Sequence, residues 1–269
     1  MKNLLQNLWE KVTNSRPWKS FFRHGWPDNP LDRSLIMTTN IFFHLHPVRV
    51  NKKSIRAAYS LGLGVITTVM FIILAITGIL LMFYYVPSTE LAYFDIVKLQ
   101  TKVPFGQLLR NMHRWGAHMM VLSAVLHMVR VFYTGAYKPP REFNWVVGVV
   151  LLILTLAASF TGYLLPWDQL AYWAITIGSN IAASPRELTD VLGITEFFDP
   201  GGFQKRLILG ADEVGAEALI RFYLLHVMVV PAILLLVISL HLWRVRKDGG
   251  LAANEVKDDE EMEAEDGSN

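Results

Sequence analysis

Three long runs without a charged residue decide the fold class of this chain. They cover residues 61–86, 143–167 and 222–243. Each run exceeds the roughly 20 residues that an α-helix needs to cross the hydrocarbon core of a bilayer. A core helix of a soluble protein can be apolar for about a dozen residues, so three such runs argue against a soluble fold.

A fourth apolar stretch is interrupted by charge. Its charge-free part, Trp115–Val129, is too short to span a bilayer unless flanking arginines lie near membrane depth. A charge at that depth costs roughly 3 kcal/mol or more, so such residues point to a functional site. We therefore expect an all-α membrane protein with a bundle of four transmembrane helices, at about 59–86, 107–134, 143–165 and 222–246.

Histidines occur in pairs on the second and fourth spans. His113 and His127 stand at i and i+14, and His226 and His241 at i and i+15. Both separations correspond to about 21–22 Å along a helix and to nearly whole turns, so each helix presents its two histidines on one face. These spans run in the same direction, which predicts the pairs His113 with His226 and His127 with His241.

Glycines follow the same spacing on the other two spans. Gly64 and Gly78 stand at i and i+14, as do Gly148 and Gly162. Glycine costs nearly 1 kcal/mol in a helix relative to alanine, but it lets the backbone approach a ligand closely. Small residues also serve helix packing in membranes. The matched spacing favours clearance for a ligand at two levels of the bundle.

Two facing imidazoles suit the axial ligation of a haem. Zinc and copper sites usually need three or four clustered ligands, whereas haem iron takes two axial ones. A lone membrane histidine is more often a helix–helix hydrogen-bonding group, and His118 is interpreted in that way. The spacing thus predicts two stacked haems inside the bundle, and six-coordinate iron indicates electron transfer.

The chain is expected to have three parts. Residues 1–50 form an N-terminal amphipathic surface extension, 51–247 the dihaem domain, and 248–269 an acidic disordered tail. Lysine and arginine cluster near both termini and in the connection between the second and third spans. The positive-inside rule then places both termini on the cytoplasmic, or n, side. The long connection at about 167–220 lies on the opposite, or p, side.

Several motifs, in order, resemble the cytochrome b family of quinol:cytochrome c oxidoreductases. They are LLRNMHRW, HMVRVFYTGAY, KPPREFNWVVGVV, TGYLLPWDQLAYWA and RFYLLH, within about residues 51–247. The short split form, cytochrome b6, is most similar. This resemblance implies electron transfer from p-side quinol through two b haems to n-side quinone, coupled to proton translocation in a Q cycle.

The same resemblance implies partners and a location. They are a Rieske iron–sulfur protein, a c-type cytochrome, membrane lipid and a two-fold dimer of the complex in a bacterial cytoplasmic (inner) membrane. No nucleic-acid partner is expected. The Pro-Glu-Trp-Tyr motif of longer members is absent from this chain, so a subunit IV-like partner should supply it. The chain has no cysteine, which excludes a thioether-linked haem, and Gly62 stands where cytochrome b6 carries that cysteine.

Site residues follow residue by residue from the matching motifs. The haem propionates are expected to pair with arginines, since opposite charge offsets buried charge: Arg110, Arg114 and Arg221 on the p side and Arg130 on the n side. Arg246 lies near the depth of the n-side quinone pocket and is a candidate for cofactor binding there. The residues expected to frame the p-side quinol pocket are Tyr163, Pro166, Trp167, Asp168, Gln169, Trp173 and Ala174. Tryptophan at a membrane interface is also an ordinary anchor.

Two other classes of function remain open from sequence. One is a dihaem membrane anchor of a dehydrogenase or hydrogenase, which would not need the TGYLLPWDQ segment. The other is a channel or transporter that uses its histidines as proton relays.

Overall fold

The computed structural model describes residues 2–15, 29–31, 34, 56–248 and 250–251. Within these ranges the structure is helical and contains no strand. The predicted disordered tail at 252–269, and most of the predicted N-terminal extension, lie outside the described residues. In that extension the structure has α1 (Lys2–Thr13), whose Leu8, Trp9 and Val12 are exposed. Its amphipathic surface role stays a prediction.

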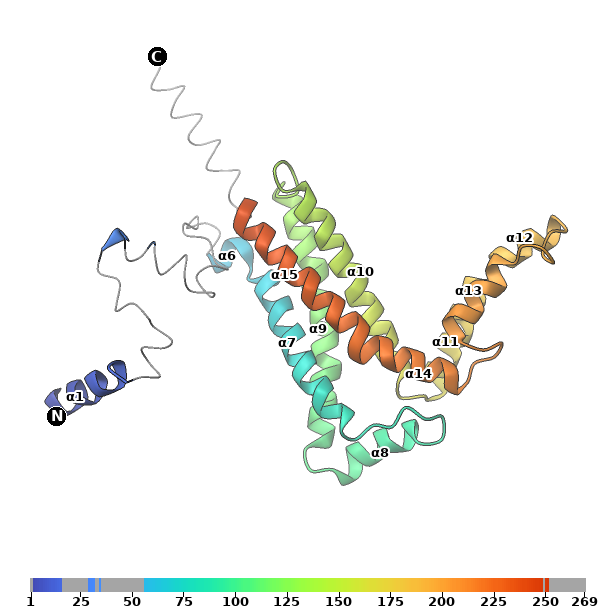
Figure 1. The fold of residues 1–269 in the computed structure, drawn as a ribbon, viewed down its shortest axis with the longest axis horizontal. Helices are drawn as coiled ribbons and strands as arrows, with labels where there is room; N and C mark the ends of the chain where they lie inside the picture. The colour runs from blue at the N-terminus through green and yellow to red at the C-terminus, as the bar shows by residue number, and fades with distance from the viewer. Residues whose placement is uncertain (1, 16–28, 32–33, 35–55, 249, 252–269) are drawn as a thin grey trace, which may run out of the picture.

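Four long helices form the bundle, as predicted (Figure 1). They are α7 (Leu63–Met82), α9 (Gly106–Tyr133), α10 (Glu142–Leu164), and the continuous segment α14 (Ala216–Leu224), η1 (Leu225–Val229) and α15 (Val230–Asp248). All four are long and apolar enough to cross a membrane. The chain is therefore an integral membrane protein with an all-α bundle.

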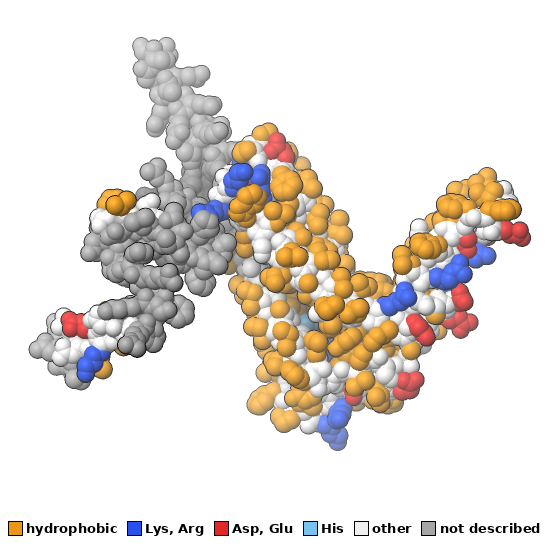
Figure 2. Space-filling model, viewed as in Figure 1, with side chains coloured by type: hydrophobic (Ala, Val, Ile, Leu, Met, Phe, Trp, Pro, Cys, Tyr) orange, Lys and Arg blue, Asp and Glu red, His pale blue; other side chains and the backbone are white. Residues whose placement is uncertain are grey.

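The two ends of the bundle carry different short elements. At one end, here called the α8 end, lie α8 (Ala92–Lys102) and α14 (Figure 1). At the other, the α6 end, lie α6 (Ala57–Ser60), the α9–α10 connection and the last turn of α15. Apolar side chains cover the visible face of the bundle between these ends, and charged groups gather near the ends and on the α11–α13 arm (Figure 2). This distribution fits a protein whose middle faces lipid or other apolar helices.

The connection between α10 and α14 is helical rather than an irregular loop. It contains α11 (Gln169–Ala183), α12 (Pro185–Val191) and α13 (Pro200–Leu209), which form an arm leading away from the bundle (Figure 1). Side-chain caps begin two of these helices, α11 and α13: Asp168 accepts a hydrogen bond from the Ala171 amide, and Asp199 accepts one from the Gly202 amide. Sequence alone predicted only a long connection here.

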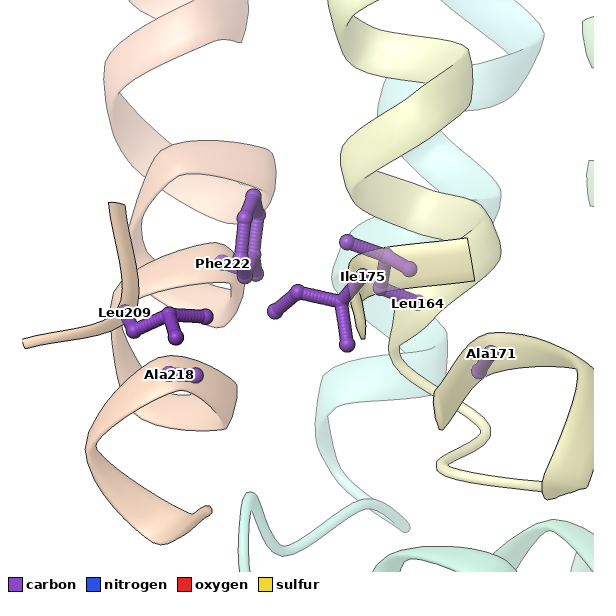
Figure 3. Packing of buried hydrophobic residues seen from close by; sticks show 6 residues of the cluster. All are labelled: Leu164, Ala171, Ile175, Leu209, Ala218 and Phe222. Atoms are coloured by element: carbon purple, nitrogen blue, oxygen red, sulfur yellow. The ribbon is translucent and has the colours of Figure 1, made fainter. Parts of the chain in front are cut away.

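A small apolar core fixes the base of this arm against the bundle (Figure 3). Its buried residues are Leu164, Ala171, Ile175, Leu209, Ala218 and Phe222. They come from α10, α11, α13 and α14, so burial of their side chains joins four helices at the α8 end. Trp167 and Ala174 pack against the same cluster.

Candidate functional site

The first histidine pair lies at the α8 end of the bundle. The rings of His113 in α9 and His226 in η1 have centroids 6.1 Å apart and planes at 77°. Thr77 Oγ1 lies 2.9 Å from His113 Nδ1 and donates its own hydrogen to the Ile73 carbonyl. The hydroxyl therefore accepts from the imidazole N–H, which leaves Nε2 of His113 unprotonated and able to bind a metal.

His226 is oriented in the same way. Its Nδ1 lies 3.1 Å from the Ala158 carbonyl oxygen and 3.2 Å from Thr161 Oγ1. A carbonyl oxygen can only accept, so Nδ1 must carry the hydrogen and Nε2 the free lone pair. These contacts are the hydrogen bonds that fix the tautomer of metal-binding histidines, and sequence analysis did not identify them.

The second pair lies toward the α6 end. The rings of His127 in α9 and His241 in α15 have centroids 6.5 Å apart and planes at 84°. His241 Nδ1 is buried without a hydrogen-bond partner among the described residues. A buried imidazole nitrogen in that state costs free energy, which is typical of a site arranged for binding rather than for packing alone.

All four predicted glycines face these rings. A Cβ built on Gly78 would lie 3.2 Å from His113 Cε1, and one on Gly162 would lie 2.5 Å from His226 Cε1. At the other level, a Cβ on Gly64 would lie 3.3 Å from His127 Cε1, and a Cβ on Gly148 would lie 3.9 Å from His241 Cε1. An imidazole therefore takes up the room left by the missing side chain at Gly64, Gly78 and Gly162, most tightly at Gly162. At Gly148 the imidazole lies at an ordinary contact distance.

The separation of the rings fits one metal ion between each pair. Metal–nitrogen bonds are about 2 Å long, so the centres of two opposed imidazoles lie about 6 Å apart. Within the described residues, no group of three or more histidines, cysteines or carboxylates could hold a metal ion. Two histidines and no further protein ligand would suit a metal that brings its other ligands with it, as haem iron does.

A π-helical turn explains the unequal histidine spacing. His226 lies in η1, the π-helix at Leu225–Val229, whereas the helical segment from His113 to His127 has no π turn. A π-bulge absorbs one extra residue, so the i, i+15 spacing in this segment covers nearly the same rotation as the i, i+14 spacing in α9. Such bulges occur often at functional sites, and nothing in the sequence pattern identified this one.

The predicted arginines divide into two groups. Arg110 is partly buried and Arg114 is exposed, close in sequence to His113. Two others contact the backbone: Arg130 Nε donates to the Tyr59 carbonyl at 2.9 Å, and Arg221 Nη1 donates to the Leu207 carbonyl at 2.6 Å. Arg246 is partly buried in the last turn of α15.

A buried guanidinium at the α6 end was not predicted as a site residue. Arg141 is only 3% exposed, and its Nη1 donates to the Gly250 carbonyl at 2.5 Å. Its Nε and Nη2 make no hydrogen bond to the described residues, and burial lowers its pKa. Arg244, three residues after His241, forms an ion pair with Asp248, in which Nη2 and Oδ2 are 2.7 Å apart. In sequence, Arg141 had served only as evidence of topology.

Three of the predicted quinol-pocket residues line a hollow of about 490 Å³ at the α8 end. They are Trp167, Asp168 and Gln169, which share it with Leu170 and with Tyr93 of α8. The other four do not line it: Tyr163 and Trp173 are exposed, and Pro166 and Ala174 are partly buried. Asp168 also caps α11, so this carboxylate has a structural task as well.

His118 lies apart from both pairs. Its side chain is exposed on α9 and meets Trp115 edge to face, with centroids 5.5 Å apart. It therefore provides an internal comparison for the four paired histidines.

Known proteins similar in sequence to this chain include cytochromes b6. Residues 49–249 match the family model described as Cytochrome b/b6/petB. The chain is 44% identical to cytochrome b6 of Heliomicrobium gestii over 187 residues, which are 70% of this chain and 82% of that protein. It is 42% identical to cytochrome b6 of Prochlorococcus marinus strain NATL1A, with 70% and 80% covered.

A solved structure with a similar fold is titled "Hyperthermophilic respiratory Complex III". It is 28% identical, with a TM-score of 0.60 over 82% of this chain. The chain spans about half of that structure's chain, 54%. From the family match over most of its length and the identity to these relatives, the chain belongs to the cytochrome b/b6 family.

Proposed function

We propose that this chain is the dihaem cytochrome b subunit of a bc-type quinol oxidoreductase. The observation that carries the proposal is the pair of facing histidines at each of two levels, with ring centroids 6.1 and 6.5 Å apart. Membership of a family of b-type cytochromes and the similarity to a Complex III structure support it. When bound, the two haems supply single-electron transfer between the ends of the bundle.

The chain's own residues hold and orient these groups. His113 and His226 would ligate one haem, and His127 and His241 the other. Thr77, Thr161 and the Ala158 carbonyl keep the Nδ1 hydrogens in place, so that Nε2 faces the metal. The four glycines admit the imidazoles between the helices.

The arginines would provide counter-charge for the haem carboxylates. Arg110 and Arg114 lie on the helix of His113. Arg246, in the last turn of α15 beyond His241, is a candidate for n-side quinone binding. Arg130 and Arg221 would need to share their guanidinium groups with the carbonyls they already contact. The proposed cofactor-site glycines are Gly64, Gly78, Gly148 and Gly162, which leave room for the imidazoles that would hold the haems.

Quinol would be oxidised at the α8 end, on the p side, and quinone reduced at the α6 end, on the n side. The hollow lined by Trp167, Asp168 and Gln169 is the proposed wall of the quinol pocket. The arginines and lysines near the α6 end support a cytoplasmic position of that end, in a bacterial inner membrane.

Partner chains are part of the proposal. Between 6% and 17% of the residues in each span are buried within this chain, which leaves surface for lipid and for other helices. We propose a Rieske iron–sulfur protein, a c-type cytochrome, a subunit IV-like chain and a two-fold dimer. Co-purification with a Rieske protein supports this assembly, whereas a flavin or nickel subunit would indicate a membrane anchor of a dehydrogenase or hydrogenase.

Haem stoichiometry is the direct test. The purified complex should show b-type bands in a reduced-minus-oxidised spectrum and two haems b per chain. His113→Ala and His127→Ala should each leave one haem, and they should remove different redox components in a potentiometric titration. His118→Ala is the matched control and should keep both. One haem or none in the unmodified protein contradicts the proposal.

A further inference from the structure

A tyrosine just after α7 reaches across the α8 end of the bundle. The Tyr85 hydroxyl donates a hydrogen bond to the Leu165 carbonyl at 2.5 Å, joining residues 80 positions apart in the chain. The Tyr85 ring stacks on Tyr223 of α14, with centroids 5.7 Å apart and planes at 22°. One side chain thus links the end of α7, the end of α10 and the helix leading to His226.

The segment that carries Tyr85 is itself held in place. The Val86 amide donates to Asp95 Oδ2 of α8 at 3.0 Å, directly after the tyrosine. Burial, and then the nearby Tyr223 and Asp95, raise the pKa of the Tyr85 phenol, so it remains a hydrogen donor throughout the physiological pH range. The hydroxyl therefore keeps the hydrogen that it donates to the Leu165 carbonyl.

The carbonyl that Tyr85 engages lies at a position of structural consequence. Leu165 is the residue after α10, and the last carbonyls of a helix have no partner within the helix. It directly precedes the turn Pro166–Trp167–Asp168, where Trp167 has a φ of 49°. A bulky residue is disfavoured in that left-handed region and persists only when its surroundings hold it.

Two sets of contacts hold this turn. On one side, Trp167 packs against the apolar cluster that Figure 3 shows, and its amide donates to the Leu164 carbonyl at 3.2 Å. On the other side, the Tyr85 hydroxyl secures Leu165. The same turn supplies Trp167 and Asp168 to the hollow of about 490 Å³.

We propose that Tyr85 is a positioning residue for the quinol pocket, acting through its hydrogen bond to Leu165 on the turn that forms the pocket wall. This inference rests on the proposed function, since it assigns a task within the same pocket. Tyr85 does not line the hollow itself. Its hydrogen bond fixes the position of Trp167 and Asp168. It therefore affects quinol binding and not haem binding.

Tyr85→Phe tests the hydrogen bond while keeping the aromatic stack. In the purified complex, the KM for a short-chain quinol that the unmodified complex oxidises should rise roughly three- to tenfold, the effect of one hydrogen bond. The kcat should change by less than about twofold, because only uniform binding is lost. Both haems should be retained with unchanged spectra.

Tyr84→Phe is the matched control. Tyr84 is the neighbouring phenol, 47% exposed, and its substitution should leave KM and haem content unchanged. An unaltered KM in Tyr85→Phe overturns the proposal. Loss of a haem in that variant also overturns it, because the tyrosine would then support the haem site instead.

A second measurement does not depend on quinol turnover. Because this chain has no cysteine, Leu170→Cys places a single thiol for a spin label beside the turn, at a side chain that is 67% exposed. The label should become more mobile when Tyr85→Phe is added and should not when Tyr84→Phe is added. If the complex oxidises no quinol but the label responds, the proposed function fails and the positioning role stands. If the label does not respond, the positioning role fails.

Discussion

Gly162 lies directly against the ring of His226: a Cβ at this position would be 2.5 Å from His226 Cε1 and 3.0 Å from Nδ1 and Nε2. At the other level, a Cβ on Gly148 would lie 3.9 Å from His241 Cε1, an ordinary van der Waals distance. The two glycines occupy corresponding sequence positions on α10 but leave different amounts of room. This difference provides a paired experiment.

Gly162→Ala is expected to displace His226 and to remove the haem at the α8 end. The added methyl group would collide with the His226 ring. This ring is already held by hydrogen bonds to Ala158 and Thr161, so it cannot simply move aside. Gly148→Ala should keep both haems, because its methyl fits. Haem content per chain is the measurement. Retention of two haems in Gly162→Ala would show that the ring and helix can separate.

Thr77→Val is expected to raise the midpoint potential of the α8-end haem by roughly 20–60 mV, the equivalent of about one hydrogen bond. The hydroxyl accepts the Nδ1 hydrogen of His113, which makes the imidazole a stronger donor and favours the oxidised metal. Potentiometric titration with optical detection resolves the two components. Thr155→Val is the control, since its hydroxyl donates to the Leu151 carbonyl, and a shift of both components would contradict the assignment.

Arg110→Ala should weaken or shift the α8-end haem and leave the α6-end haem nearly intact. Arg110 and Arg114 are like charges one helical turn apart, an arrangement that favours an anionic partner between them. Loss of one cation near the iron should lower its midpoint potential by on the order of tens of mV. Arg130→Ala should act on the other haem. Equal changes of both haems in Arg110→Ala would exclude this pairing.

Deletion of Met228 should be tolerated and keep both haems. Met228 lies in the π turn and is 57% exposed, so its loss should convert η1 to regular α-helix. His226 and His241 would then have the spacing that His113 and His127 have in α9. Deletion of Leu236, which is 71% exposed in α15, removes a residue where there is no π turn. It should rotate His241 by about 100° and lose the α6-end haem. Equal haem content in the two deletions would refute the role of the bulge.

Much of the architecture could be predicted from residue order because the bilayer restricts the choices. Three charge-free runs of membrane length and a fourth apolar stretch interrupted by charge predicted four spans, and the structure confirms four helices near those positions. The periodicity of 3.6 residues per turn predicted which histidines would face each other, and the rings of His113 and His226 do lie side by side. Ligation of haem by these histidines remains a prediction.

The arm between α10 and α14 could not be predicted as helices. Its helices have 15 residues or fewer, so their helical state depends on the Asp168 and Asp199 caps and on burial of Leu209 and Ile175 in a shared core. Only three of the seven proposed pocket residues line the hollow, because their neighbours turn toward the core or toward the surface. Local motifs do not reveal which way a side chain faces after an irregular turn.

The sequence by itself determined the membrane class, the number of spans, the two levels of paired histidines and the family. The membrane class, the spans and the histidine levels depend on hydropathy and on helical repeat, which act within single segments. The family follows from the resemblance of several motifs along the chain. Tertiary structure alone decided the threonine partners of the imidazoles, the π turn at His226, the burial of Arg141 and the contact of Tyr85 with Leu165. Each of these depends on how separate helices meet, and residues as far as 80 positions apart must come together before the contact exists.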